Sequence, residues 1–306
     1  LALATMFDQG HDYDNAFRQM QLGNNKIGEI RPFRGDLFQK LIKELMSDFQ
    51  LPSEQPMTHG RRPIFVVGLP RSGSTLVEQI LSAHPDVNST DELTFVGDIA
   101  KGLESKNNYA IAMSRLTERE SYNLGAAYLQ KIEGYTKNSE PCFVDKTPEN
   151  FLHIGLIKTI FPNAKIVDIF RDPLDNAMSL YKQFFAKGRE YSYSLNGIVF
   201  YWQGYLTLMK YWRSMYSDTI LRLDYERLVT KPREAIKEIL THCELSHEAV
   251  CFSPHKSLRP VLTPSAAQVR EPISSASLGS GLNYKNKVKT YLPKFADLKR
   301  VSESLN

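Results

Sequence analysis

The stretch Ile64-Phe-Val-Val-Gly-Leu-Pro-Arg-Ser-Gly-Ser-Thr75 decides the fold of this chain of 306 residues. It begins with an apolar, β-branched run of strand length, and Gly68 and Gly73 then bracket a bend of four residues. Ser74 and Thr75 open a helix whose apolar residues share one face. Such a turn directs backbone N–H groups and a helix N-terminus at one point, so the stretch predicts a phosphate-binding loop.

The cation of this loop differs from that of nucleotide-hydrolysing P-loops. Those loops read G-x-x-x-x-G-K-[ST], and their lysine reaches the β- and γ-phosphates. Ser74 stands at the lysine position here, and the cation is Arg71 instead. Because arginine is a planar, bidentate partner for an oxyanion, the loop suits a single phosphate or sulfate-like group better than a triphosphate with its metal. An ordinary strand–turn–helix with an incidental pair of glycines is the alternative interpretation.

The segment Pro70-Arg-Ser-Gly-Ser-Thr75 resembles the 5′-phosphosulfate loop of the sulfotransferases. It is most similar to that of tyrosylprotein sulfotransferases and of bacterial sulfotransferases fused to tetratricopeptide repeats. The resemblance implies 3′-phosphoadenosine 5′-phosphosulfate (PAPS) as the co-substrate and adenosine 3′,5′-bisphosphate (PAP) as the product. It also implies which residues hold the donor's phosphosulfate: Arg71, Ser72, Gly73, Ser74 and Thr75. Similar motifs follow in the family's order as far as about Tyr284.

A second phosphate site is expected after Lys165-Ile-Val-Asp-Ile-Phe170, which is a buried-strand pattern. The next residues, Arg171-Asp-Pro, suit a helix start, since aspartate favours the N-cap and proline the first turn. Ser179 follows two turns along this expected helix. In the sulfotransferases the matching arginine and serine grip the 3′-phosphate of the donor, so the resemblance implies that role for Arg171 and Ser179.

Two residues match the family's catalytic groups. Glu92, in Thr90-Asp-Glu-Leu-Thr94, falls where the family carries the glutamate that takes the proton of the acceptor hydroxyl. Lys146, in Pro141-Cys-Phe-Val-Asp-Lys-Thr-Pro148, resembles the lysine that reaches the bridging oxygen and the transferred sulfuryl group. Without the resemblance, the two acids would read as a solvated helix start and the lysine as a surface residue beside a turn.

Two later motifs complete the resemblance. Leu221-Arg-Leu-Asp-Tyr-Glu-Arg-Leu-Val229 follows a family pattern, so we expect Tyr225 to line the nucleotide site. The segment 263–273 resembles the late loop that closes over the donor, with Ser265 as the expected donor contact and Gln268 nearby. As generic sequence, the two segments would be a turn tyrosine and a polar loop.

The chain departs from the family pattern at two places. Tyrosylprotein sulfotransferases place an arginine that meets acidic substrate residues where this chain has Thr94. Relatives usually carry a basic residue and a tryptophan where this chain has Ser280-Gly281. The first departure weakens the case for an acidic tyrosine peptide as acceptor. The second predicts a looser nucleotide lid, unless Lys285 or Lys287 compensates.

The amino-acid composition is typical of a globular protein. With 42% hydrophobic and 24% charged residues, the chain is expected to be globular, with one large domain or one and a half. A net charge of +4 suits anionic ligands, yet no basic run is concentrated enough to predict a nucleic-acid partner. The seven histidines show no metal-ligand spacing, so no metal is expected. Because the chain has only three cysteines and no long apolar stretch, we expect a cytoplasmic protein without a membrane span.

The N-terminal residues 1–55 are expected to be helical. Gly10-His-Asp-Tyr-Asp-Asn-Ala-Phe-Arg-Gln-Met20 has tetratricopeptide-like spacing, which predicts the end of a truncated repeat array. A plain amphipathic hairpin is the alternative, and a connecting helix is expected over Phe33–Phe49. A repeat-like segment of this kind could also form a homodimer. Residues 61–306 are expected to form the sulfotransferase domain.

Strand and helix patterns alternate along that domain. Strands are expected at 63–67, 142–145, 165–170 and 219–223, and helices at 74–83, across 92–133, and at 149–161, 173–187, 194–216 and 232–242. The alternation predicts an α/β fold, with a P-loop-type parallel sheet covered by helices on both faces. Residues 252–292 are expected to form an irregular lid.

The sequence therefore predicts a PAPS-dependent sulfotransferase that acts on a hydroxyl group. A P-loop kinase-like phosphotransferase is one rival, although Ser74 at the lysine position argues against it. A non-catalytic peptide-binding scaffold is the other. Protein tyrosine, a carbohydrate hydroxyl and a small-molecule hydroxyl all remain open as acceptors, because no residue of the sequence selects among them.

Overall fold

The structure, a computed structural model, describes residues 1–51, 57–104, 108–135, 140–257 and 268–305. Its residues form two compact units. We call residues Ile42–Phe170 and Leu208–Ser275 the sheet unit. Residues Leu1–Leu41, Arg171–Thr207 and Ala276–Asn306 are the helical unit.

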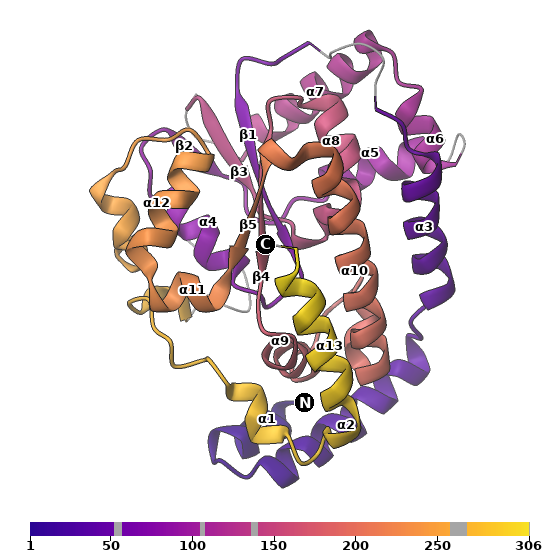
Figure 1. The fold of residues 1–306 in the computed structure, drawn as a ribbon, viewed down its shortest axis with the longest axis vertical. Coiled ribbons are helices and arrows are strands. Elements are labelled where there is room, and N and C mark those ends of the chain that lie inside the picture. The colour runs from indigo at the N-terminus through magenta and orange to yellow at the C-terminus, as the bar shows by residue number, and fades with distance from the viewer. Residues whose placement is uncertain (52–56, 105–107, 136–139, 258–267, 306) are drawn as a thin grey trace. The chain divides into compact units, whose positions relative to one another are not determined.

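The sheet unit contains a five-stranded sheet in which every neighbouring pair is parallel (Figure 1). The strand order is β2-β3-β1-β4-β5. The strands are β1 (Arg62–Gly68), β2 (Val87–Ser89), β3 (Cys142–Asp145), β4 (Lys165–Phe170) and β5 (Ile220–Asp224). The expected parallel sheet is thus confirmed, and its four longer strands lie where the sequence predicts them. Parallel strands end at a common edge, so the residues that follow β1, β2 and β3 gather there.

Most helices of the sheet unit lie where the sequence predicts them, although it predicts none over Tyr225–Thr230. They are α4 (Ser74–Ser82), α5 (Phe95–Glu104), α6 (Tyr109–Ser114), α7 (Glu118–Glu133), α8 (Ile154–Ile160), α11 (Tyr225–Thr230) and α12 (Pro232–His242). Two further helices, α3 (Gly35–Asp48) and α10 (Leu195–Tyr216), contain residues of both units.

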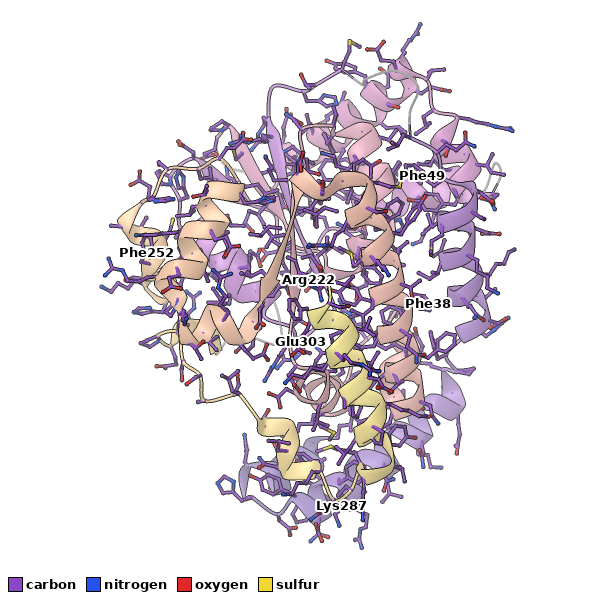
Figure 2. The ribbon with its side chains drawn as sticks, viewed as in Figure 1. Phe38, Phe49, Arg222, Phe252, Lys287 and Glu303 are labelled. Atoms are coloured by element: carbon purple, nitrogen blue, oxygen red, sulfur yellow. The ribbon has the colours of Figure 1, made fainter. Side chains whose placement is uncertain are left out.

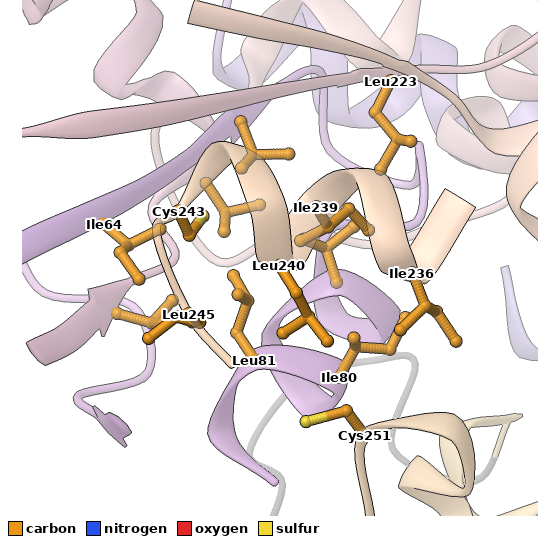
Figure 3. Close-up of a cluster of buried hydrophobic side chains, with 14 of the residues drawn as sticks. Ile64, Ile80, Leu81, Leu223, Ile236, Ile239, Leu240, Cys243, Leu245 and Cys251 are labelled. Carbon is orange, nitrogen blue, oxygen red and sulfur yellow. The ribbon is translucent and has the colours of Figure 1, made fainter. Parts of the chain in front are cut away.

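One face of the sheet packs on α4 and α12 (Figure 3). Buried aliphatic side chains of the two helices meet those of β1, β4 and β5 there, for example Ile80, Leu240 and Leu223. The opposite face carries aromatic residues, where Phe65 and Phe143 pack against Tyr128 of α7. Burial of each such side chain contributes about 1.5–3 kcal/mol. Because the sheet and the apolar face of α4 share one core, the start of α4 is fixed at the end of β1.

A buried ion pair fixes the register of β4 and β5. Asp168 and Arg222 are directly paired across the two strands, with 2.8 Å between Arg222 Nη1 and Asp168 Oδ2. Figure 2 labels Arg222. Both side chains are almost fully buried, and the guanidinium also lies 3.9 Å from the centre of the Phe170 ring. Removing one partner of such a pair costs about 3–5 kcal/mol, because the other charge stays buried.

The helical unit contains α1 (Ala2–Gln9), α2 (Tyr13–Ile30), α9 (Pro173–Tyr181) and α13 (Leu292–Glu303) (Figure 1). Asp8 of α1 accepts hydrogen bonds from the Lys182 ammonium at 2.8 and 3.0 Å and from the Tyr284 hydroxyl. The buried Asn24 of α2 donates to the Tyr181 carbonyl at 2.9 Å. The N-terminal helices thus exist, and α2 contacts the last residue of α9. Their assignment to a tetratricopeptide array and the domain boundary before residue 61 stay predictions.

Two expected helices differ from those observed, and one observed strand was not expected. The helix expected at 173–187 ends at Tyr181, because the Tyr193 hydroxyl bonds both the N–H and the carbonyl of Phe185 and replaces the helical partners there. The helix expected at 149–161 begins as a 3₁₀ turn, Pro148–His153, before α8. Strand β2 has three residues, too few for a sequence pattern.

The described part of the expected lid is irregular, as predicted. It holds short 3₁₀ turns at Gln268–Arg270, Ser280–Tyr284 and Lys289–Tyr291. Among the described residues, no helix is both long and apolar enough to cross a bilayer.

Candidate active site

The loop between β1 and α4 has the geometry of an anion site. Gly73 is the N-cap residue of α4, at φ +102°, so no side chain of that residue covers the first N–H groups of the helix. Arg71 adopts φ +69°, a left-handed conformation that costs a non-glycine residue about 1 kcal/mol or more. Ser72, Ser74 and Thr75 are buried around the helix start. A strained arginine beside a helix N-terminus is an arrangement suited to phosphate or sulfate.

Tyr225 lies against this loop. It is the first residue of α11, and a Cβ placed on Gly73 would overlap the Tyr225 ring. Position 73 therefore requires glycine for two reasons, the positive φ and the close approach of the ring. The structure thus brings Tyr225 to the predicted phosphosulfate loop, within the sheet unit.

Glu92 and Lys146 form an ion pair at the ends of β2 and β3. Lys146 Nζ donates to Glu92 Oε1 at 2.7 Å. The lysine side chain is fully buried, whereas that of Glu92 is 36% exposed. A buried ammonium next to a carboxylate that reaches solvent can act as a fixed positive charge beside a proton acceptor.

The backbone on either side of Glu92 is bonded to the end of β3. The N–H of Lys146 donates to the Asp91 carbonyl at 3.2 Å, and the N–H of Leu93 donates to Thr147 Oγ1 at 3.1 Å. Asp91 adopts φ +57°, a second strained conformation next to the site. Glu92 is therefore presented by a backbone that is held on both sides.

Asp145 supports this arrangement from the core. It accepts hydrogen bonds from the Tyr128 hydroxyl at 2.6 Å and from Thr147 Oγ1 at 2.8 Å. Burial raises the pKa of Asp145 to about 6, and the hydrogen bonds from Tyr128 and Thr147 oppose this rise. Burial, together with the negative charge of Asp145, raises the pKa of Tyr128 well above its ordinary value. These groups bond one another and Thr147, whose hydroxyl also accepts from the N–H of Leu93 next to Glu92.

Glu78 of α4 also approaches Lys146. Its Oε2 lies 3.8 Å from Lys146 Nζ, and its side chain is 1% exposed. The Ser89 hydroxyl donates to Glu78 Oε1. Helix α4 rises about 1.5 Å per residue, so Glu78 stands about 6 Å along the helix from Ser74. One helix thus joins the anion loop to the surroundings of Lys146.

Arg171 lies in the helical unit, directly after β4. Its Nη2 donates to the Ser277 carbonyl at 2.7 Å and lies 3.6 Å from Asp175 Oδ2. Asp175 in turn accepts from the N–H groups of Gly279 at 2.8 Å and Gly281 at 2.7 Å. We call Ser277–Gly281 the docked segment, because these bonds hold it on α9.

The docked segment corrects the expectation of a looser lid at Ser280-Gly281. A Cβ on Gly281 would lie 2.9 Å from the backbone of Leu174, so glycine allows the segment to approach α9 closely. Two N–H bonds to a buried carboxylate then hold it. Lys287 instead pairs with Asp14, at 2.9 Å.

The remaining two predicted site residues are Ser179 and Ser265. Ser179 lies on α9, half-buried, in the same unit as Arg171. Ser265 lies outside the described residues. The expectation that no metal takes part likewise stays a prediction, although no metal-binding group of histidine, cysteine or acidic residues occurs in the ranges that the structure describes.

Sequence reasoning missed Glu78, Thr147 and Asp175. Glu78 stands among the apolar residues of α4, and a charged residue on such a face is the available signal. Asp175 lies four residues after Arg171, a spacing that brings helical side chains together. Thr147 gives no local signal, because its role depends on contacts with Leu93 and Asp145.

The fold and the site together define a class of protein. A parallel α/β sheet presents an anion loop after β1 and a buried lysine–glutamate pair after β2 and β3, which suits the transfer of an anionic group. The chain belongs to the sulfotransferase family, whose profile matches residues 63–249.

The chain is also similar to several curated proteins. An uncharacterized protein of Aquifex aeolicus (strain VF5) is 33% identical over 299 residues, which cover 92% of this chain and 39% of the relative. The chain thus spans well under half of that protein. A putative protein-tyrosine sulfotransferase of Caenorhabditis briggsae is 24% identical over 222 residues, covering 71% of this chain and 79% of the relative.

A solved structure shares the fold. The sulfotransferase domain of the olefin synthase of Synechococcus PCC 7002 superimposes with a TM-score of 0.53 at 19% identity. The match covers 84% of this chain and 97% of that domain. At this level of identity the likeness concerns the fold.

Proposed function

We propose that this protein transfers a sulfuryl group from PAPS to an acceptor hydroxyl, with Glu92 as the general base. The observation that carries the proposal is the 2.7 Å pair of Glu92 and Lys146, next to Glu78 of the helix that starts at the anion loop. Family membership supports sulfuryl transfer, and the pair supplies a base and a cation at one place.

The reaction we propose is an in-line displacement at sulfur. The acceptor oxygen forms a bond to sulfur while its hydroxyl proton passes to the Glu92 carboxylate. The bond from sulfur to the 5′-phosphate oxygen breaks, and its electron pair stays on PAP. A positioned base of this kind contributes about 10²–10⁴-fold.

Lys146 acts on the departing group in this proposal. Negative charge grows on the phosphate oxygen as the bond to sulfur breaks, so a fixed ammonium stabilises the transition state more than the ground state. Full burial strengthens this effect, since water cannot screen the charge.

The two phosphate groups of the donor have separate sets of proposed ligands. Arg71 and the start of α4, Gly73 to Thr75, would bind the 5′-phosphosulfate, and the Tyr225 ring would line the nucleotide site. Arg171 and Ser179 of the helical unit would bind the 3′-phosphate, and Ser265 would contact the donor from the late loop. The buried guanidinium of Arg171 supplies a charge of the right kind for the 3′-phosphate.

The acceptor is a hydroxyl of a protein, a carbohydrate or a small molecule. The C. briggsae relative is named for protein tyrosine, which places tyrosine among the acceptors to test. Thr94 stands where the tyrosylprotein sulfotransferases carry an arginine, and its hydroxyl donates to Asp98 at 2.9 Å, so this position presents no cation to an acidic substrate. That environment favours a neutral or basic acceptor over an acidic peptide.

Calorimetric titration of the purified chain with PAP and, separately, with ATP and Mg²⁺ tests the donor. We expect PAP to bind and ATP with Mg²⁺ to bind far more weakly. Transfer of ³⁵S from labelled PAPS to a panel of a neutral tyrosine peptide, an acidic tyrosine peptide, a phenol and a monosaccharide then tests the reaction. Preference for ATP with Mg²⁺ would overturn the donor in favour of a kinase-like activity, and PAP binding without transfer would favour the scaffold.

A further inference from the structure

Lys146 carries its charge in a place without water. Its side chain is 0% exposed, and an isolated ammonium in such a place is strongly disfavoured. The charge is tolerated because two carboxylates lie beside it, Glu92 at 2.7 Å and Glu78 at 3.8 Å. Glu92 and Glu78 differ in their distance from Lys146 Nζ and in their burial. The two acids can therefore have different roles in the reaction.

The nearer carboxylate is the one that changes charge in the proposed reaction. When Glu92 takes the acceptor proton it becomes neutral, and Lys146 loses the charge of its closer partner. Lys146 must stay protonated at this moment, because the charge on the departing phosphate oxygen is then largest. A second carboxylate that does not titrate in the reaction would keep it so.

Glu78 has the features of such a group. It is buried, and its Oε1 accepts a hydrogen bond from Ser89 at the end of β2. The same hydroxyl accepts from the N–H of Asp91 at 3.3 Å. Glu78, Ser89 and the Glu92 loop are therefore held together.

Two other acidic residues, Asp145 and Asp91, lie close to Lys146 in the sequence or the structure and make other contacts. Asp145 ends β3 just before Lys146, whose charge opposes the rise that burial causes in the pKa of Asp145. Tyr128 and Thr147 bond the Asp145 carboxylate. Asp91 presents its carbonyl to the backbone N–H of Lys146. Within the part of the chain that the structure describes, Glu78 of α4 and Glu92 of the loop after β2 form ion pairs with the ammonium itself.

We propose that Glu78 is a positioning residue that serves as the permanent counterion of Lys146, keeping its ammonium charged and in place while Glu92 accepts the proton. The inference rests on the proposed function for its catalytic meaning. No bond to Glu78 forms or breaks, and its charge is the same before and after transfer.

The substitution Glu92→Gln mimics the protonated base and allows the claim to be tested without an acceptor. Lysine labelled with ¹³C at the ε carbon, with Lys146→Met for assignment, reports the titration of Lys146 by NMR. In the E92Q variant we expect Lys146 to remain charged at neutral pH, because Glu78 is present. In the E78Q/E92Q variant we expect its titration midpoint to fall by about one pH unit or more.

A matched control carries the same loss of charge at an exposed site. The E92Q/E133Q variant also changes Glu133, an exposed glutamate of α7. We expect Lys146 to have the same titration midpoint in this variant as in E92Q. If E78Q/E92Q does not fold, Ser89→Ala in the E92Q background releases Glu78 instead and should lower the midpoint by a smaller amount. An unchanged midpoint in the variant that folds overturns the proposal.

Kinetics give a second readout with the acceptor that the panel identifies. E78Q alone should lower kcat, move the alkaline limb of the kcat profile to lower pH and leave PAP affinity unchanged, since PAP lacks the sulfuryl group. A structural role would lower stability without moving the pH profile. If wild-type protein binds no PAP and transfers no sulfate, the proposed function fails, while the NMR titration still decides the role of Glu78.

Discussion

The surroundings of Lys146 and those of Arg171 hold a buried cation in two different ways. Lys146, in the sheet unit, is paired with the side chains of Glu92 and Glu78, one of which reaches solvent. Arg171, in the helical unit, is bonded to the Ser277 carbonyl and lies by Asp175, which itself holds two backbone N–H groups. A carboxylate partner can accept a proton during a reaction, whereas a backbone carbonyl keeps the same charge throughout. The difference suits chemistry at Lys146 and binding at Arg171.

The largest expected effect is at Lys146. Lys146→Ala should lower kcat by about 10³-fold, because the cation at the departing oxygen is lost. It should also lower the free energy of unfolding by about 3–5 kcal/mol, because Glu78 stays buried without its partner. Steady-state ³⁵S transfer and urea unfolding measure the two effects.

Lys101→Ala, at an exposed lysine of the same unit, is the control for that variant and should change neither quantity. The variant E78Q/K146A should recover part of the lost stability and none of the activity. An active Lys146→Ala protein would contradict the role of this residue in the reaction.

Arg171→Ala should act on binding instead. Loss of charge-assisted hydrogen bonds to the 3′-phosphate should weaken PAP about 10–100-fold and leave adenosine 5′-phosphate, which lacks that group, nearly unchanged. Calorimetry with the two nucleotides separates the cases, and the exposed Arg300→Ala serves as the control. Equal weakening of both nucleotides would point to a general loss of structure and against a 3′-phosphate site.

A smaller effect is expected from Gly281→Ala, which leaves every charged group in place. The added methyl group meets the Leu174 backbone, so the docked segment must move, at a cost of about 1–3 kcal/mol in stability. PAP affinity should fall a few-fold, because the Ser277 carbonyl that orients Arg171 moves with it. Gly28→Ala on α2 has open space around it and should be neutral or slightly stabilising. If Gly281→Ala bound PAP as tightly as the wild type does, the docked segment would have no part in donor binding.

The smallest expected effect concerns Asp145 and pH. Its pKa is raised by burial to about 6, so the folded state binds more protons than the unfolded state, and stability falls as pH rises through this range. Asp145→Asn removes this slope, which we expect to be worth about 1 kcal/mol between pH 5 and pH 7. Urea unfolding of both proteins at the two pH values measures the difference. The same slope in both would mean that Asp145 does not titrate there.

Local motifs of the sequence predict much of this site. The strand, bend and helix start from Ile64 to Thr75 lie together in the chain, and their apolar pattern and glycines are enough to place them. The resemblance to the sulfotransferases singles out Glu92 and Lys146 by their positions after that loop, and the structure has their side chains 2.7 Å apart. A parallel sheet does this by collecting the ends of its strands at one edge.

The supporting residues depend on contacts that no local pattern contains. Asp175 holds Gly281, which lies 106 residues further along the chain. The early end of the helix at Tyr181 depends on the hydroxyl of Tyr193, and nothing in residues 173–187 indicates it. Long-range side-chain bonds of this kind are decided by the folded structure.

The most direct test of the account is sulfuryl transfer by the wild type and by Glu92→Gln, measured beside PAP affinity. We predict ³⁵S transfer from PAPS by the wild type, a loss of at least about 10²-fold in the variant and equal PAP binding by both. Transfer by Glu92→Gln at the wild-type rate would contradict the assignment of the base.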